Sequence, residues 1–138
     1  MTAQVDAMLF DLDTQAAAET EGLGAAIGAS PWVAVLLLVG NGLLAPIAEE
    51  RVWRGIVQTE LVDTWGVAPG IAVTAVLFAL KHVVVDGSVA RLTTLLALGL
   101  VFGLVRHRWG TASSTVTHVA TNTIASASII AVSLYGPV

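Results

Sequence analysis

Long stretches without a charged side chain constrain this 138-residue sequence more than any other feature. No Asp, Glu, Lys or Arg occurs in residues 22–48, 64–80, 92–105 or 109–138. A water-soluble helix of such length needs a polar face, and these stretches contain little that is polar besides Ser, Thr and Gly. Charged residues make up only 12% of the chain, about half the share in a soluble domain. The sequence therefore predicts an integral membrane protein in contact with the lipid bilayer.

Turn residues divide the apolar part of the chain into four helical segments. The expected segments span residues 31–62, 68–85, 89–105 and 112–134. We expect an all-α, multi-pass transmembrane helical bundle in the cell membrane. In it, an acidic, partly helical tail over residues 1–29 precedes a four-helix core over residues 31–136.

The first segment is longer than a membrane requires. At 1.5 Å per residue it spans about 48 Å, whereas the hydrocarbon core is roughly 30 Å thick. Pro46 removes a backbone hydrogen bond and follows the pair Asn41-Gly42 closely. We therefore expect the first helix to be bent near these residues.

Charge and cysteine content exclude several classes of protein. The net charge is −4, but five of the ten acidic residues precede the first apolar segment. The six basic residues form no patch that could follow a phosphate backbone, so nucleic acid is not an expected partner. The chain has no cysteine, which excludes disulfides and thiolate metal sites. The first thirty residues lack Lys and Arg, so no cleavable signal is expected there.

Two adjacent glutamates lie in the first apolar segment, where ionisable groups are costly and are candidates for function. Glu50 and Arg54 are four residues apart, so they can pair across one helical turn. Glu49 lies about 100° around the helix from Glu50 and is expected to face a different cavity without a compensating charge. Desolvation makes such a carboxylate more basic, which suits the activation of water. The alternative is an ion-pair network of both glutamates with Arg51 and Arg54 at a membrane interface.

His82 shares a helix face with Phe78, four residues earlier. Such a histidine alone is typical of packing. However, Glu49 and His82 lie about equally far from the turn between their segments, so an antiparallel hairpin brings them to one depth, about 22 Å from the turn. His118 lies only about 10 Å into its helix. Either the fourth helix starts recessed, or Pro46 bends the first helix.

His118 and Asn122 form a second pair with four-residue spacing, and both can donate hydrogen bonds into one pocket. Two donors on one face fit an oxyanion hole. The alternative is hydrogen bonding between helices, which nearby hydroxyls also suggest: Ser113, Thr117, Thr121 and Ser126. Gly99 and Gly103, four residues apart, predict close helix packing.

Together these motifs resemble the CAAX-protease and bacteriocin-processing (CPBP) family of intramembrane glutamic peptidases, which includes the CAAX prenyl endopeptidases. Three motifs occur in the family's order: EERVWR at residues 49–54, FALKH at residues 78–82 and HVATN at residues 118–122. Trp53 stands where the family commonly has Phe. The resemblance covers residues 31–134, and the full-length prenyl endopeptidases carry additional membrane helices that this sequence lacks. It therefore implies the peptidase chemistry and leaves a prenylated substrate open.

The resemblance implies a role for each motif residue of the catalytic core. Glu49 and His82 would activate water, and His118 and Asn122 would stabilise the oxyanion. The site would be supported by Glu50, Arg54 and Phe78.

We therefore expect an intramembrane endopeptidase that uses a glutamate-activated water and no cofactor. Its expected substrates are proteins or peptides, including membrane-anchored ones. One alternative is a zinc-dependent intramembrane protease with Glu49, His82 and His118 as the His₂Glu ligands, although the sequence has no HExxH motif. The same polar residues would also suit a non-catalytic membrane immunity or scaffold protein, or a proton or ion relay.

Overall fold

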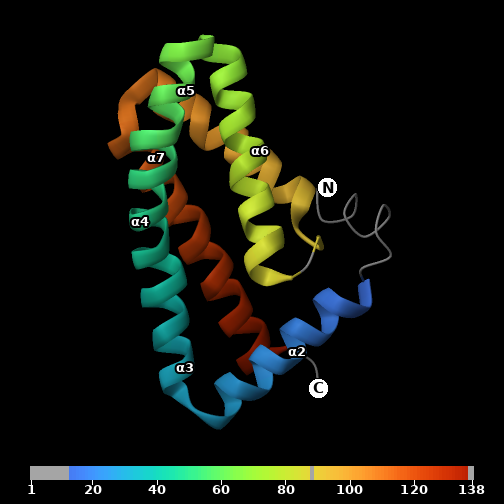
Figure 1. The fold of residues 1–138 in the computed structure, drawn as a ribbon. Helices are drawn as coiled ribbons and strands as arrows, with labels where there is room; N and C mark the ends of the chain where they lie inside the picture. Colours follow the sequence, from blue (N-terminus) through green and yellow to red (C-terminus); the bar gives the residue numbers. More distant parts are fainter. Residues whose placement is uncertain (1–12, 88, 137–138) are drawn as a thin grey trace.

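The computed structural model describes residues 13–87 and 89–136, and all regular structure in these ranges is helical (Figure 1). The elements are α2 (Asp13–Ala29), α3 (Pro31–Leu36), η1 (Leu37–Leu44), α4 (Ala45–Val52), η2 (Trp53–Val57), α5 (Gln58–Trp65), α6 (Val67–Asp86) and α7 (Leu92–Tyr135). Both η1 and η2 are π-helical. The predicted all-α class is confirmed. The part of the expected acidic tail in residues 1–12, and Ser88 of the second turn, lie outside the described residues.

Elements α3 to α5 form one continuous helix, Pro31–Trp65, which we call the rod. Its α-helical pattern changes to a π-helix in η1, which ends two residues before Pro46. A proline nitrogen carries no hydrogen, so Pro46 offers no donor to Gly42 O, four residues earlier, or to Asn41 O, five residues earlier. The irregularity predicted near these residues therefore takes the form of a π-helical segment without a break.

Helix α7 is folded into two arms at Gly110, whose φ of 87° and ψ of 169° are not helical. A φ of this size is costly for residues other than glycine. The first arm covers residues 92–109 and the second covers residues 111–135, so the predicted third and fourth segments are both present. The first arm starts at Leu92 rather than at residue 89, because Leu92 N–H donates to Val89 O in a turn.

The second arm starts recessed, short of the end of the rod. Ser114, the fourth residue of the second arm, donates a hydrogen bond to Glu50 of the rod. Glu50 lies 15 residues before Trp65, the last residue of the rod, which is about 22 Å along a helix. Figure 1 shows the second arm returning beside α4. The sequence left two ways to bring His118 to the depth of Glu49 and His82: a recessed start of the fourth helix, or a bend of the first helix at Pro46. The structure has the recessed start.

Glycines let the first arm of α7 approach α6 closely. A Cβ added to Gly99 would lie 3.0 Å from the Cα of Ala75, and one added to Gly103 would lie 2.8 Å from a methyl carbon of Ile71. Side chains larger than hydrogen would therefore push the two helices apart. The predicted close packing at these two glycines is confirmed.

Helix α2 packs against the end of α7 (Figure 1). Ile27 is buried, and a Cβ added to Gly24 would lie 3.3 Å from Ser133 Oγ. The described part of the expected tail is therefore a helix that contributes to packing.

Three helices are long and apolar enough to cross a membrane: Pro31–Trp65, Val67–Asp86 and Leu92–Tyr135. Exposed aromatic residues lie at helix ends, namely Trp32, Trp65, Trp109 and Tyr135. Such positions are typical of the aromatic belts at membrane interfaces.

Candidate active site

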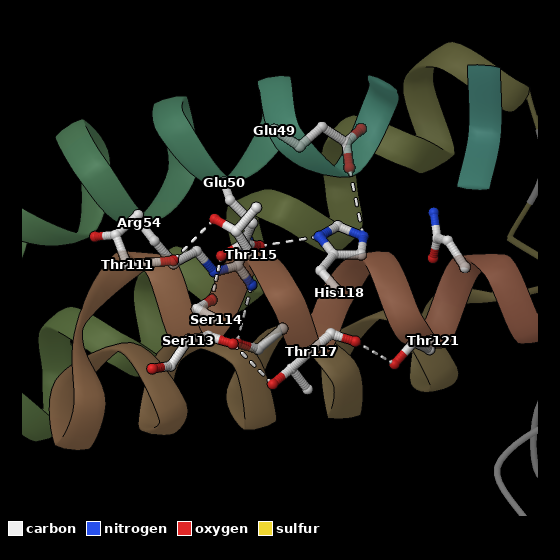
Figure 2. Close-up of polar contacts among 12 residues, drawn as sticks. Glu49, Glu50, Arg54, Thr111, Ser113, Ser114, Thr115, Thr117, His118 and Thr121 are labelled. Atoms are coloured by element: carbon white, nitrogen blue, oxygen red, sulfur yellow. Dashed lines mark hydrogen bonds and ion pairs between the residues drawn. The ribbon is translucent and has the colours of Figure 1, made fainter. Parts of the chain in front are cut away.

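One face of the rod carries three polar side chains at four-residue intervals, and all three are fully buried: Glu50, Arg54 and Gln58. Arg54 Nη1 lies 3.2 Å from Glu50 Oε1, so the predicted ion pair is present. The other carboxylate oxygen of Glu50 accepts a hydrogen bond from Ser114 Oγ. Figure 2 shows these groups between the rod and the second arm of α7. Glu50 therefore joins the two elements.

Arg54 extends this buried network to the first arm of α7. Its Nη2 donates to Gly99 O at 3.1 Å, and Gln58 Nε2 donates to Gly103 O at 3.0 Å. The guanidinium carbon lies 4.6 Å from the ring centre of Phe78 and 5.4 Å from that of Phe102. The two glycines that permit close packing thus also expose the carbonyls that accept from the rod.

Glu49 faces the other way, into a cavity, and its side chain is 18% exposed. Its Oε1 lies 3.6 Å from His82 Nε2, and its Oε2 lies 3.8 Å from His118 Nε2. The predicted meeting of Glu49 with His82 is confirmed. The prediction that Glu49 has no compensating charge is wrong, because Lys81 Nζ donates to Glu49 Oε1 at 2.6 Å.

His82 is held in one orientation by its own helix. Its Nδ1 lies 2.8 Å from Phe78 O. A carbonyl oxygen only accepts, so Nδ1 carries the proton and, in the neutral ring, Nε2 is left as an acceptor that faces Glu49. The Phe78 ring packs edge-on against the His82 ring, with centroids 4.7 Å apart. Phe78 thus supports the site through its backbone and its side chain.

His118 lies between the two glutamates and is almost fully buried. Its Nδ1 lies 3.0 Å from Glu50 Oε1, while its Nε2 faces Glu49. Its ring stacks on Phe102 at a centroid distance of 4.3 Å. Figure 2 shows the ring pointing from the second arm of α7 towards both carboxylates.

Asn122 contacts the backbone of the rod at the π-helical segment. Its Nδ2 donates to Asn41 O at 3.0 Å, and Thr123 Oγ1 donates to Gly42 O at 3.2 Å. These are the two carbonyls that Pro46 leaves without its N–H. Asn122 also lines the cavity beside His118, and its amide has a second hydrogen to offer there.

The hydroxyls expected between helices divide into two groups. Asn41 Nδ2 donates to Ser126 Oγ at 3.1 Å, so Ser126 does connect the rod to α7. Thr117 and Thr121 instead donate to backbone carbonyls four residues earlier in the second arm, and Ser113 donates to Trp109 O across the kink at Gly110. For these three hydroxyls the acceptor lies within α7 and not on another helix, so they do not support the alternative of hydrogen bonding between helices.

A cavity of about 400 Å³ contains the polar side chains of Glu49, Lys81, His82, His118 and Asn122. Apolar side chains continue its wall along both arms of α7: Leu95, Leu98, Ala125 and Ile129. The cavity therefore combines ionisable groups with an apolar wall.

The zinc alternative concerns Glu49, His82 and His118. Within residues 13–87 and 89–136, no group of three His, Asp or Glu side chains is arranged to hold a metal ion. Glu49 lies 3.6 Å from His82 Nε2 and 3.8 Å from His118 Nε2, while the Nδ1 atoms of the two rings face Phe78 O and Glu50.

Sequence reasoning missed Lys81 and Ser114. Lys81 is the only lysine in the sequence and directly precedes His82. This position beside a predicted site residue could have identified it. Ser114 precedes His118 by four residues and therefore shares its face, so the same periodicity could have found it.

Over the described residues, the fold and site define a helical protein with three helices long and apolar enough to cross a membrane and a cluster of glutamates and histidines between them. A family model described as type II CAAX prenyl endopeptidase Rce1-like matches residues 31–124, more than half of the chain. The chain belongs to this family of CAAX proteases, and the predicted resemblance is confirmed. No curated protein and no solved structure matches the chain.

Proposed function

We propose that the chain is a multi-pass endopeptidase of the cell membrane that hydrolyses a peptide bond with water activated by Glu49. The observation that carries this proposal is the position of Glu49, whose two oxygens face the Nε2 atoms of His82 and His118 inside the cavity. Glu49 also lies near the middle of the Pro31–Trp65 helix, 16 residues from its end at Trp65. This placement supports cleavage within the membrane.

Glu49 and His82 are placed to hold one water molecule on the cavity side. Glu49 Oε1 and His82 Nε2 are 3.6 Å apart and make no direct hydrogen bond, so a water in the cavity can lie within hydrogen-bond distance of both atoms. Such a water donates one hydrogen to Glu49 and the other to His82 Nε2, which leaves its lone pairs for a carbonyl carbon. Glu49 takes the proton as the water attacks.

His118 and Asn122 are placed to stabilise the resulting oxyanion. Glu50 holds the Nδ1 side of His118, so Nε2 is the side of the ring that is directed at the reacting groups. With Nδ1 directed at Glu50, the ring donates to the oxyanion from Nε2 when it carries a proton on both nitrogens. The second amide hydrogen of Asn122 supplies another donor from the same helix face.

The substrate is proposed to be a protein or peptide that reaches the site from the membrane, including a membrane-anchored one. Apolar side chains of both α7 arms line the cavity next to the polar cluster. They suit apolar residues beside the scissile bond.

The test uses the full chain in proteoliposomes with a library of internally quenched peptides in ¹⁸O water. We expect cleavage that places ¹⁸O in the new carboxylate, and loss of cleavage in Glu49→Gln. Glu60→Gln is the matched control, because Glu60 is an exposed glutamate of the same rod. No cleavage by the wild-type chain, or full cleavage by Glu49→Gln, would contradict the proposal.

A further inference from the structure

Cleavage of a peptide bond needs a proton at the leaving nitrogen as well as an activated water. An amine is expelled from the tetrahedral intermediate only when its nitrogen is protonated, and a positioned acid supplies this proton. Glu49 removes a proton from water at the start of the reaction. A second group that already carries a proton can then protonate the leaving nitrogen without waiting for Glu49 to release its own.

Lys81 has the geometry for that role. Its Nζ lies 2.6 Å from Glu49 Oε1, on the oxygen that faces His82. Its side chain lines the cavity and is 35% exposed. An ammonium has three N–H groups, and Glu49 is the one hydrogen-bond partner of Lys81 among the described residues. Protons therefore remain to be donated into the cavity.

The remaining polar groups of the cavity fit this step less well. His82 directs its Nδ1 proton to Phe78 O. Arg91 is paired with Asp86 at 2.6 Å, and a guanidinium does not give up a proton in proteins. Asn122 does not ionise, and His118 is directed by Glu50 for the oxyanion. Lys81 differs from each of them because it is protonated, exposed to the cavity and in direct contact with the general base.

Resting on the proposed function, we propose that Lys81 is a catalytic residue that protonates the leaving nitrogen. Water loses one proton to Glu49 and forms the new C–O bond. The C–N bond then breaks as Lys81 Nζ gives a proton to the nitrogen, which leaves a neutral amine on Lys81. The protonated Glu49 carboxyl returns its proton to Lys81 across their hydrogen bond. The pair is thereby restored to carboxylate and ammonium, and one water has been consumed.

The test compares two leaving groups in the full chain in proteoliposomes. A peptide that the wild-type chain cleaves is taken from the quenched library and resynthesised with sulfur in place of the scissile N–H. A thiolate leaves without protonation, so this thioester needs the general base and the oxyanion donors but not the acid. Lys81→Met and Lys81→Arg are measured on both substrates, together with thermal unfolding. Lys81→Arg keeps the positive charge beside Glu49 but cannot release a proton.

We expect both variants to lower kcat for the peptide by about 10²-fold and kcat for the thioester by less than about threefold. Equal losses on both substrates would overturn the proposal, since Lys81 would then act by orienting Glu49. A wild-type rate for Lys81→Arg on the peptide would also overturn it. Failure of the proposed function is distinguishable, because it would appear as thioester and peptide cleavage that persist in Glu49→Gln.

Discussion

Glu49 and Glu50 are neighbours in sequence but belong to two different regions of the molecule. Glu50 is fully buried and is engaged by Arg54, Ser114 and His118, which come from the rod and from the second arm of α7. Glu49 is partly exposed to a cavity and meets the side chains of Lys81 and His82 from α6. The two side chains leave the helix in directions about 100° apart. Glu50 therefore has both oxygens engaged by protein groups, whereas Glu49 can still bind water.

The difference shows how one membrane helix can carry two acidic residues with different roles, one structural and one facing the cavity. A buried carboxylate whose oxygens are all engaged fixes its partners and has little capacity to bind a water molecule. A carboxylate beside open space keeps that capacity. His118 connects the two regions, because one ring nitrogen contacts Glu50 and the other faces Glu49.

Removal of the buried cation is the strongest way to test the structural region. Arg54→Ala leaves Glu50 buried without its ion-pair partner, so we expect a loss of about 3–5 kcal/mol in the free energy of unfolding. Thermal unfolding in detergent, followed by circular dichroism, measures this. If the variant melts like the wild type and loses only activity, the assignment of this region to structure is wrong.

Asn122→Ala tests the cavity region with a smaller effect. We expect about a 10²-fold lower cleavage rate, with measurable activity left because His118 still donates to the oxyanion. Thr123→Val is the matched control, since it removes the parallel hydrogen bond to the rod at Gly42 O. The control should lose some stability and little activity. Equal activity losses in both variants would assign Asn122 to helix packing.

Ser114→Ala removes one hydrogen bond from the charged, buried Glu50. We expect a stability loss of about 1.5–3 kcal/mol. Thr117→Val is its control on the same arm and should change stability by less than about 0.5 kcal/mol, because Thr117 Oγ1 bonds within that arm, to Ser113 O. Denaturation in detergent compares the two, and indistinguishable results would show that Ser114 does not anchor Glu50.

A chelator is expected to have no effect on cleavage, because a carboxylate base and an imidazole need no ion to activate water. The measurement is peptide cleavage before and after treatment with EDTA. Activity that is lost and then restored by zinc would instead favour a metal held by Glu49, His82 and His118.

The sequence predicted those contacts that depend on distance along a helix. The Glu50–Arg54 pair follows from four-residue spacing, and the meeting of Glu49 with His82 follows from equal distances to one turn. Contacts that depend on how one helix is rotated against another were missed, such as Lys81 with Glu49. The recess of the second α7 arm depends on where its kinked backbone at Gly110 docks, which apolar periodicity does not determine.

The division between the two glutamates is tested most directly by Glu49→Gln and Glu50→Gln in parallel, with melting and peptide cleavage measured on the same preparations. We predict that Glu49→Gln melts close to the wild type, since its partly exposed pair with Lys81 contributes little to stability, and that its cleavage rate falls by at least about 10²-fold. Glu50→Gln should melt at a clearly lower temperature, because Arg54 loses its buried counter-charge. A Glu49→Gln variant that cleaves at the wild-type rate, or that is destabilised as much as Glu50→Gln, would contradict the account.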